Sequence, residues 1–162
     1  MRIEIDISNA KLTQRNLTIW TTALCAWNCD WLRAHPEAPL FYQAGLRYAR
    51  EAPGEEDFQP IPKLYARGYG DCEDLSAARA ADLRVRFNVQ AKPEVIQIRP
   101  GLWHIFVRLP DGRAEDPSAH LGMEIPPEMV AAGKRKMAAL AAAAKTRPIP
   151  GGPPSWASLS RF

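Results

Sequence analysis

The sequence predicts an α+β protein, on three observations. Helix-like patterns fill the first half of the chain and strand-like patterns follow them, without the strand–helix alternation of a parallel sheet. The most regular pattern is a helical apolar period over residues 13–33. The 162 residues are 46% hydrophobic and 24% charged, which is typical of a globular chain with one buried core. We expect one domain over residues 1–145.

The first elements are predicted from apolar spacing. Residues 2–7 alternate apolar with polar side chains, which indicates a short half-buried strand. Residues 13–33 form a long amphipathic helix that ends before Pro36, since proline disfavours the helical conformation in the residue preceding it. Residues 36–62 hold many prolines and are expected to be extended and looped. The large apolar side chains of the long helix are expected to face the core rather than a ligand: Leu17, Trp20, Leu24, Trp27 and Trp31.

Two further helices are expected at residues 62–67, stopped by Gly68, and at residues 71–86. Asp71 is a good N-cap residue, and Asp74 lies three residues later, in a variant of the reciprocal capping box. We therefore expect the second helix to begin with both carboxylates on its first turn.

A small antiparallel sheet should follow. Residues 94–98 and 102–109 are strand-like, and Asp111-Gly112 is a hairpin signal that leads into a third short strand. An alanine-rich helix is expected from Pro126 to about residue 145. Residues 146–162 hold four prolines and a glycine pair and are predicted to be an extended arm.

Composition bears on the class of partner. The net charge of +3 arises from 21 basic and 18 acidic residues and does not favour nucleic acid as the principal partner. The basic residues of the second and last predicted helices are an alternative nucleic-acid contact, weighed against a solvated helix face: Arg79, Arg84, Arg86 and Lys134-Arg135-Lys136. No apolar run approaches the roughly 20 residues of a membrane span, and the first residues do not resemble a signal peptide. We expect a cytosolic protein without a membrane partner.

Three cysteines are present. Cys25 and Cys29 are expected to be buried thiols, because cysteine packs like a small hydrophobic residue and no further metal ligands lie nearby at suitable spacing. We expect no metal site and no cofactor.

Cys72 is the candidate nucleophile. Gly68-Tyr69-Gly70-Asp71-Cys72 delivers it to the first turn of a helix, where backbone N–H groups and the helix dipole favour a thiolate. The neighbouring acids Asp71, Glu73 and Asp74 oppose this unless they point away. The reactivity of the thiol would therefore depend on a partner base.

His104 and Asp116 are the candidate base and the residue that orients it. A plain two-residue turn at Asp111-Gly112 would place Asp116 opposite Val107, facing away from His104. A bulge, a longer loop, or a position beyond the strand end would bring the two together. The alternative is that none of the three residues is catalytic: Cys72 is a packed thiol at a helix end, His104 lies on one face of a strand, and Asp116-Pro117-Ser118 is a turn or cap.

Together these motifs resemble the core of the transglutaminase-like superfamily, which has a papain-type fold. The resemblance rests on Gly-Asp-Cys-Glu-Asp-Leu opening a helix, Trp103-His104 on a strand, and Glu115-Asp116-Pro117 after it, and covers about residues 65–123. Residues 40–48 and 121–123 are similar to small members encoded by tailed bacteriophages. Asn88 stands where the family commonly has a glycine, and asparagine adopts the same left-handed conformation.

The resemblance implies a Cys72-His104-Asp116 triad in a thiol peptidase, amidase or acyl transferase acting on a protein or peptide amide, without calcium control. The Cys72 backbone N–H would stabilise the oxyanion, together with one upstream side chain among Gln43, Gln59, Tyr65 and Tyr69. The alternative is a structural or assembly protein of a phage particle, with residues 146–162 docking on a neighbouring subunit. Either would be found in the bacterial host cytoplasm or in the virion.

Overall fold

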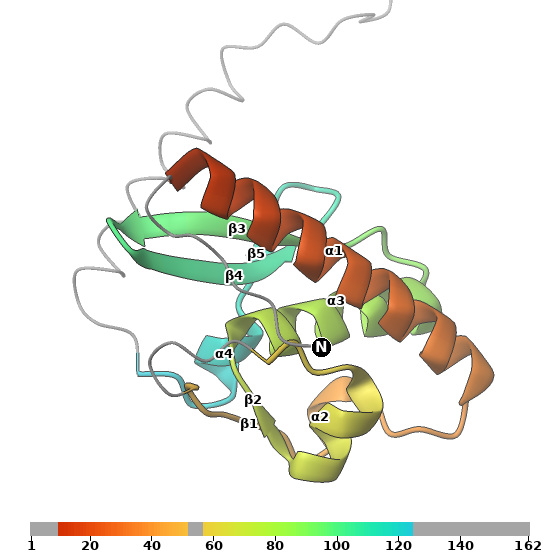
Figure 1. Cartoon of the computed structure of the whole chain (residues 1–162). Helices are drawn as coiled ribbons and strands as arrows, with labels where there is room; N and C mark the ends of the chain where they lie inside the picture. Colours follow the sequence, from red (N-terminus) through yellow and green to blue (C-terminus); the bar gives the residue numbers. More distant parts are fainter. Residues whose placement is uncertain (1–9, 52–56, 125–162) are drawn as a thin grey trace, which may run out of the picture. The chain divides into compact units, whose positions relative to one another are not determined.

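A computed structural model describes residues 10–51 and 57–124 of the chain (Figure 1). The described residues form a mixed helix and sheet structure, as the α+β prediction requires. They contain a long helix, α1 (Ala10–Ala34), a 3₁₀ turn, η1 (Phe41–Gln43), and further helices and strands in this order: β1 (Arg47–Tyr48), α2 (Ile61–Arg67), β2 (Tyr69–Gly70), α3 (Cys72–Phe87), β3 (Lys92–Arg99), β4 (Leu102–Arg108), β5 (Ala114–Glu115) and α4 (Pro117–His120).

The long helix is confirmed, but the prediction that its whole aromatic stripe is core is wrong. Trp27 is 48% exposed, and Trp20 is only half-buried. The face of α1 that enters the core carries smaller side chains instead: Thr13, Leu17, Thr21, Cys25, Asn28, Cys29 and Leu32.

The small side chains on this face of α1 are explained by the helix that packs against it, α3. Cys25, Cys29 and Leu32 share one buried cluster with four alanines of α3, namely Ala77, Ala78, Ala80 and Ala81. Small side chains on both helices permit close approach, whereas an indole would hold them apart. The indoles therefore lie on the flank of α1. Cys25 and Cys29 are buried free thiols, as predicted.

Both ends of α2 are fixed by specific contacts. Its first residue, Ile61, donates its backbone N–H to Asn28 Oδ1 of α1 at 2.8 Å. Gly68 ends the helix in the left-handed conformation, φ 73°, and its N–H bonds the carbonyl of Leu64. The predicted helix at residues 62–67 and its stop are confirmed.

The second predicted helix is confirmed as α3, and Asn88 ends it with φ 52°. The predicted capping box is wrong. Asp71 occupies the N-cap position, yet its side chain makes no capping bond to the first turn. Asp74 is fully buried and instead accepts hydrogen bonds from Gln59, because Gln59 in the incoming loop offers it a backbone and a side-chain donor.

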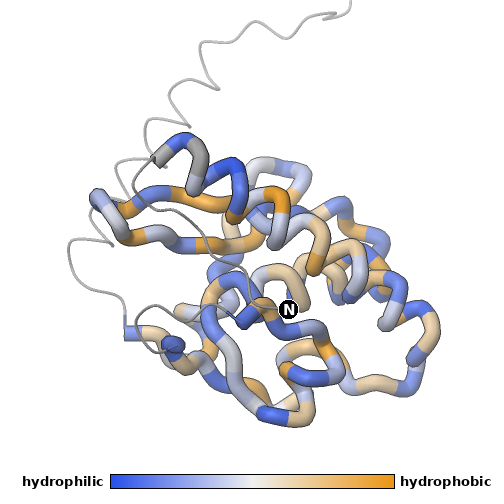
Figure 2. The backbone as a smooth tube through the Cα atoms, viewed as in Figure 1, coloured by the Kyte–Doolittle hydropathy of each residue, from blue (hydrophilic) through white to orange (hydrophobic). Residues whose placement is uncertain are grey.

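Two small sheets are present among the described residues. β3, β4 and β5 form an antiparallel sheet in chain order, as predicted, with Ile96 opposite His104. β3 and β4 both contain hydrophobic and hydrophilic segments (Figure 2), and residues 104–107 of β4 are all buried. The parallel pair β1–β2, with Tyr48 opposite Gly70, was not predicted.

The hairpin between β4 and β5 has a three-residue loop, Pro110–Gly112. Val107 pairs with Glu115, Arg108 with Ala114, and the Leu109 N–H bonds the carbonyl of Arg113. The predicted hairpin is confirmed, and of the alternatives for its loop the longer one is formed, because Pro110 has no N–H to continue the ladder and Gly112 supplies the left-handed residue, φ 87°, that a longer loop needs.

Several predictions lie outside the described residues: the strand at residues 2–7, the helix from Pro126 to residue 145, the domain limit at residue 145 and the arm at residues 146–162. All described residues belong to one compact unit, which runs to residue 125. Among them, no helix has the length and apolarity needed to cross a membrane.

Candidate active site

Cys72 is the first residue of α3 and is half-buried. It packs against a small cluster formed by Leu17, Val95 and Ile105, together with Phe58 and Trp103. Trp103 and Ile105 are the residues on either side of His104 in β4. The thiol therefore lies at the helix N-terminus, against the two sequence neighbours of the candidate base in β4.

His104 and Asp116 are in direct contact. The Nε2 of His104 lies 2.8 Å from Oδ2 of Asp116. The other carboxylate oxygen accepts the backbone N–H groups of Ser118 and Ala119, at 3.1 and 3.2 Å, and so caps α4. Because each oxygen has its own donors, the carboxylate is fixed in position. His104 is only 6% exposed.

The helix that carries Cys72 is hydrogen-bonded to the sequence neighbours of the other two residues, one on β4 and one on β5. Ser76, one turn after Cys72, donates to the carbonyl of Ile105 at 2.9 Å. Arg79, one turn further, bonds Glu115, the residue before Asp116, at 2.7 Å. The structure thus joins His104 to Asp116 directly and holds α3 beside both.

Acidic groups crowd the start of α3. The Sγ of Cys72 donates to Oε2 of Glu73 at 3.4 Å. Carboxylate oxygens of Glu51, Asp71 and Glu73 all lie within 4.8 Å of one another, a donor set that could hold a divalent cation. No metal site was expected from the sequence. This cluster of carboxylates was not identified there, because Glu51 comes from a different segment of the chain than Asp71 and Glu73.

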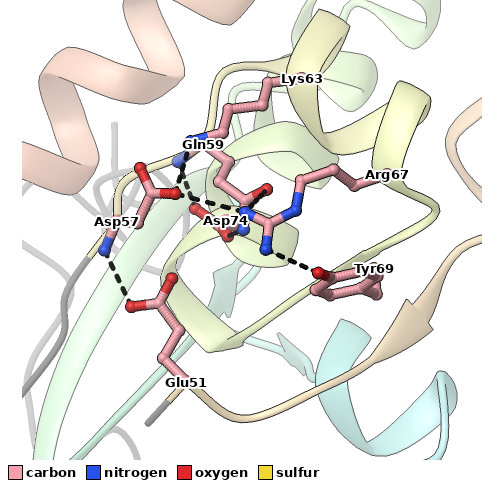
Figure 3. A network of polar contacts seen from close by, with 7 residues as sticks. All are labelled: Glu51, Asp57, Gln59, Lys63, Arg67, Tyr69 and Asp74. Carbon is pink, nitrogen blue, oxygen red and sulfur yellow. Dashed lines mark hydrogen bonds and ion pairs between the residues drawn. The ribbon is translucent and has the colours of Figure 1, made fainter.

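A polar network continues from this end of α3 (Figure 3). Asp74 accepts the N–H of Gln59 at 2.6 Å and its side-chain amide at 2.7 Å, and Arg67 donates to the other side-chain atom, Oε1, of Gln59 at 3.1 Å. Burial, followed by the charge of Asp71, raises the pKa of Asp74 to about 9. Asp74 is therefore protonated near neutral pH.

The four predicted oxyanion side chains lie in different surroundings. Gln43 is exposed in η1, and Tyr69 is held between Arg47 and Arg67, with its hydroxyl accepting from Arg67 at 2.6 Å. Burial, followed by the charge of Asp82, raises the pKa of Tyr65 to about 12, and Asp82 lies ten residues after Cys72, or about 15 Å along the helix. Gln59 lies beside the first turn of α3, but its amide N–H is bonded to Asp74.

Two other side chains near Cys72 were not identified from the sequence as oxyanion donors. Burial, followed by the charges of Cys72 and Asp71, raises the pKa of Tyr48 to about 12, so its phenol is protonated at neutral pH. The indole N–H of Trp103 is buried without a hydrogen-bond partner among the described residues. Trp103 could have been identified from the sequence, because it is next to His104. Tyr48 could not, because it comes near Cys72 through the pairing of Tyr48 with Gly70, which joins two distant segments.

The alternative nucleic-acid face is not a solvated surface in α3. The side chains of Arg79 and Arg86 are only 15% and 16% exposed, and both pair with the buried Asp82. Arg84 donates to the carbonyl of Ala91. The expectation that these arginines are solvated is wrong, since each is used inside the fold; residues 134–136 lie outside the described part of the chain.

Comparison with known proteins found no match: no family model matches the chain, and neither the curated proteins nor the solved structures contain a significant relative.

Proposed function

We propose that this protein is a transglutaminase-like thiol enzyme that cleaves or transfers an amide-bound acyl group, with Cys72, His104 and Asp116 as its triad and the described elements as a papain-type core. The observation that carries the proposal is the 2.8 Å contact between His104 Nε2 and an Asp116 carboxylate fixed by two backbone N–H groups. A histidine oriented in this way keeps its other ring nitrogen, Nδ1, for a proton from a thiol.

The chemistry follows from these groups. His104 Nδ1 takes the Cys72 proton, and the thiolate attacks the carbonyl carbon, whose π electrons move to the oxygen. Collapse of this intermediate expels the amine, which takes the proton from His104 and leaves a thioester on Cys72. Water or a second amine then attacks the thioester carbonyl and gives its proton to His104. Collapse breaks the C–S bond and releases the acyl product, and the Cys72 thiolate takes the proton back from His104. Asp116 stabilises the imidazolium in both halves.

The developing oxyanion needs preorganised donors. The backbone N–H of Cys72 at the start of α3 is one. The unpartnered indole N–H of Trp103 and the neutral phenol of Tyr48 are the additional donors that the surroundings favour over Gln43, Tyr65 and Tyr69. Trp103→Phe and Tyr48→Phe would test the two separately, since each removes one donor and keeps the ring.

One observation favours the second candidate, a structural protein of a particle that uses the same fold. The thiol of Cys72 donates to Glu73 and lies among further carboxylates, which oppose a thiolate. In that case the contact between His104 and Asp116 serves only to fasten β4 to α4.

The experiment is the pH dependence of Cys72 alkylation by iodoacetamide, with the modified residue located by mass spectrometry. In the wild type, the thiol should react well below the free-cysteine pKa of ~8.5. His104→Gln, which keeps a donor toward Asp116, should lose this advantage. His35→Gln is the matched control, because His35 stacks on Trp31 at the end of α1.

Acylation by p-nitrophenyl acetate then separates reactivity from turnover. The enzyme should form an acetyl-Cys72 adduct, which water then hydrolyses to release acetate. If Cys72 instead titrates as an ordinary thiol in both the wild type and His104→Gln, the enzyme proposal is wrong and the structural role is favoured.

A further inference from the structure

A pocket lies between α1 and the segment that leads into α2. Trp20, Leu24 and Trp27, spaced along one flank of α1, form one wall. Phe58 and Pro60 form the opposite wall. The pocket holds about 400 Å³, within the roughly 300–1,000 Å³ of sites for small ligands.

The lining of the pocket is mostly apolar. Its two charged lining residues, Asp57 and Lys63, form an ion pair with each other, and Asp57 also accepts from Arg67. Because these charges are paired, they are less available to a charged ligand. The remaining surface consists of two indoles, a phenyl ring and aliphatic groups, which favour an uncharged apolar or aromatic guest.

This pocket is continuous with the surroundings of Cys72. Phe58 lines the pocket and also packs in the cluster that contains Cys72. Leu17 of the same cluster lies one helical turn before Trp20 on α1. Phe58 therefore joins the pocket to the cluster around Cys72, so that a substrate bound at Cys72 has an apolar depression beside that cluster.

We propose that the pocket of Trp20, Leu24, Trp27 and Phe58 is the specificity subsite of this enzyme, and that it takes an aromatic or large aliphatic side chain of the acyl substrate. The inference rests on the proposed function for the identity of the site that it serves. It also accounts for the exposure of Trp27, since a 48% exposed indole on an otherwise well-packed helix gains burial when a guest enters.

Binding is tested first, without any catalytic step. The probes are N-acetyl-phenylalanine amide, N-acetyl-lysine amide and N-acetyl-glycine amide, and the readout is the indole N–H signals of the protein by NMR, assigned with Trp→Phe variants. The phenylalanine amide should shift the Trp20 and Trp27 signals in a saturable way, and the other two amides should shift them little.

The variants for this experiment are matched within one helix. Trp27→Ala should abolish the response of Trp20 to the phenylalanine amide. Ile19→Ala should leave that response intact, because Ile19 is 50% exposed on α1 and does not line the pocket. Equal shifts with all three amides, shifts at other indoles, or shifts that follow protein concentration alone would each overturn the subsite.

The link to Cys72 is tested with two iodoacetamides that differ only in their N-substituent, ethyl or phenethyl. The phenethyl reagent should alkylate Cys72 about tenfold faster, the effect of roughly 1.4 kcal/mol of apolar binding. Trp27→Ala should reduce this ratio to near one, whereas Ile19→Ala, outside the pocket, should keep the tenfold ratio. A ratio near one in the wild type would also overturn the subsite.

These measurements keep the two proposals apart. If the indole shifts and the phenethyl preference are found while Cys72 shows no advantage from His104, the apolar subsite stands and the catalytic proposal fails. If Cys72 is activated by His104 and neither the shifts nor the preference is found, the enzyme proposal stands and the subsite is wrong.

Discussion

Asp116 lies on the side of the hairpin that carries His104, and the length of the loop between β4 and β5 determines this. With Val107 opposite Glu115, the next residue along, Asp116, falls opposite Phe106, which shares a face with His104. A loop one residue shorter would pair Pro110 with Arg113 and turn Asp116 to the other face. The 2.8 Å contact therefore depends on a three-residue loop.

The first prediction concerns Gly112, which gives this loop its left-handed residue, φ 87°. Gly112→Val should cost about 1–2 kcal/mol, because a β-branched residue disfavours positive φ. It should also slow Cys72 alkylation at pH 7 by loosening Asp116. Gly101→Val is the matched control: Gly101 has φ 75°, open space at its Cβ position, and lies in the hairpin that does not carry Asp116. A similar loss of stability with unchanged alkylation is expected there, and equal alkylation rates in both variants would contradict the prediction.

The second prediction separates the two roles of the Asp116 carboxylate. Asp116→Asn retains an N-cap acceptor for Ser118 and Ala119, so the free energy of unfolding should change little. Asp116→Ala should cost about 1 kcal/mol through loss of the cap. Both should lower Cys72 alkylation at pH 7 by about tenfold or more, the effect of one pKa unit or greater on the thiolate fraction. Wild-type reactivity in Asp116→Asn would show that the charge on Asp116 is not used.

The helices and main strands were predictable from the sequence because each has a local cause. The apolar period predicted α1, Gly68 predicted the end of α2, and strand-like apolar runs followed by a hairpin signal predicted β3 and β4. Cys72 at a helix start and His104 on a strand followed from the same signals.

The remaining features depend on contacts between distant segments. The aromatic stripe of α1 was misread, because only the alanine face of α3 decides that Trp27 stays on the flank. Asp74 was expected to cap α3, but Gln59, fifteen residues earlier, supplies better donors. The register that brings Asp116 to His104 depended on one loop residue, a difference that the Asp-Gly signal alone does not resolve.

The third prediction tests the attachment of β5 to α3. Glu115 accepts Arg79 Nε and the Tyr42 hydroxyl, both at 2.7 Å. Glu115→Gln should cost about 1–3 kcal/mol, as expected for weakening hydrogen bonds to a charged group, and should slow Cys72 alkylation because Asp116 follows directly. Glu94→Gln removes a comparable partner from Arg108, at 2.9 Å on both nitrogens, and should cost similar stability. Loss of reactivity in both variants would indicate a general structural effect rather than positioning of Asp116.

The last prediction concerns the pH dependence of stability. The pKa of Asp74 is raised to about 9 in the folded protein, chiefly by burial, against about 3.9 in the unfolded chain. Between these values the unfolded chain has released the proton and the folded protein retains it, so the folded state binds more protons. The stability that Asp74 contributes is then fully present below about pH 4 and is lost as the pH rises toward 9.

Asp74→Asn cannot ionise, so its free energy of unfolding, measured in urea from pH 5 to pH 9, should fall less with pH than that of the wild type. At pH 5 the variant should be less stable by about 1–3 kcal/mol, because an amide offers Gln59 one acceptor where the carboxyl offers two. Asp111→Asn is the matched control, since Asp111 is exposed in the hairpin loop and its pKa is lowered by Arg113; the variant should retain the wild-type slope. Parallel curves for Asp74→Asn and the wild type would show that Asp74 is already ionised in the folded protein and that Gln59 stabilises the carboxylate.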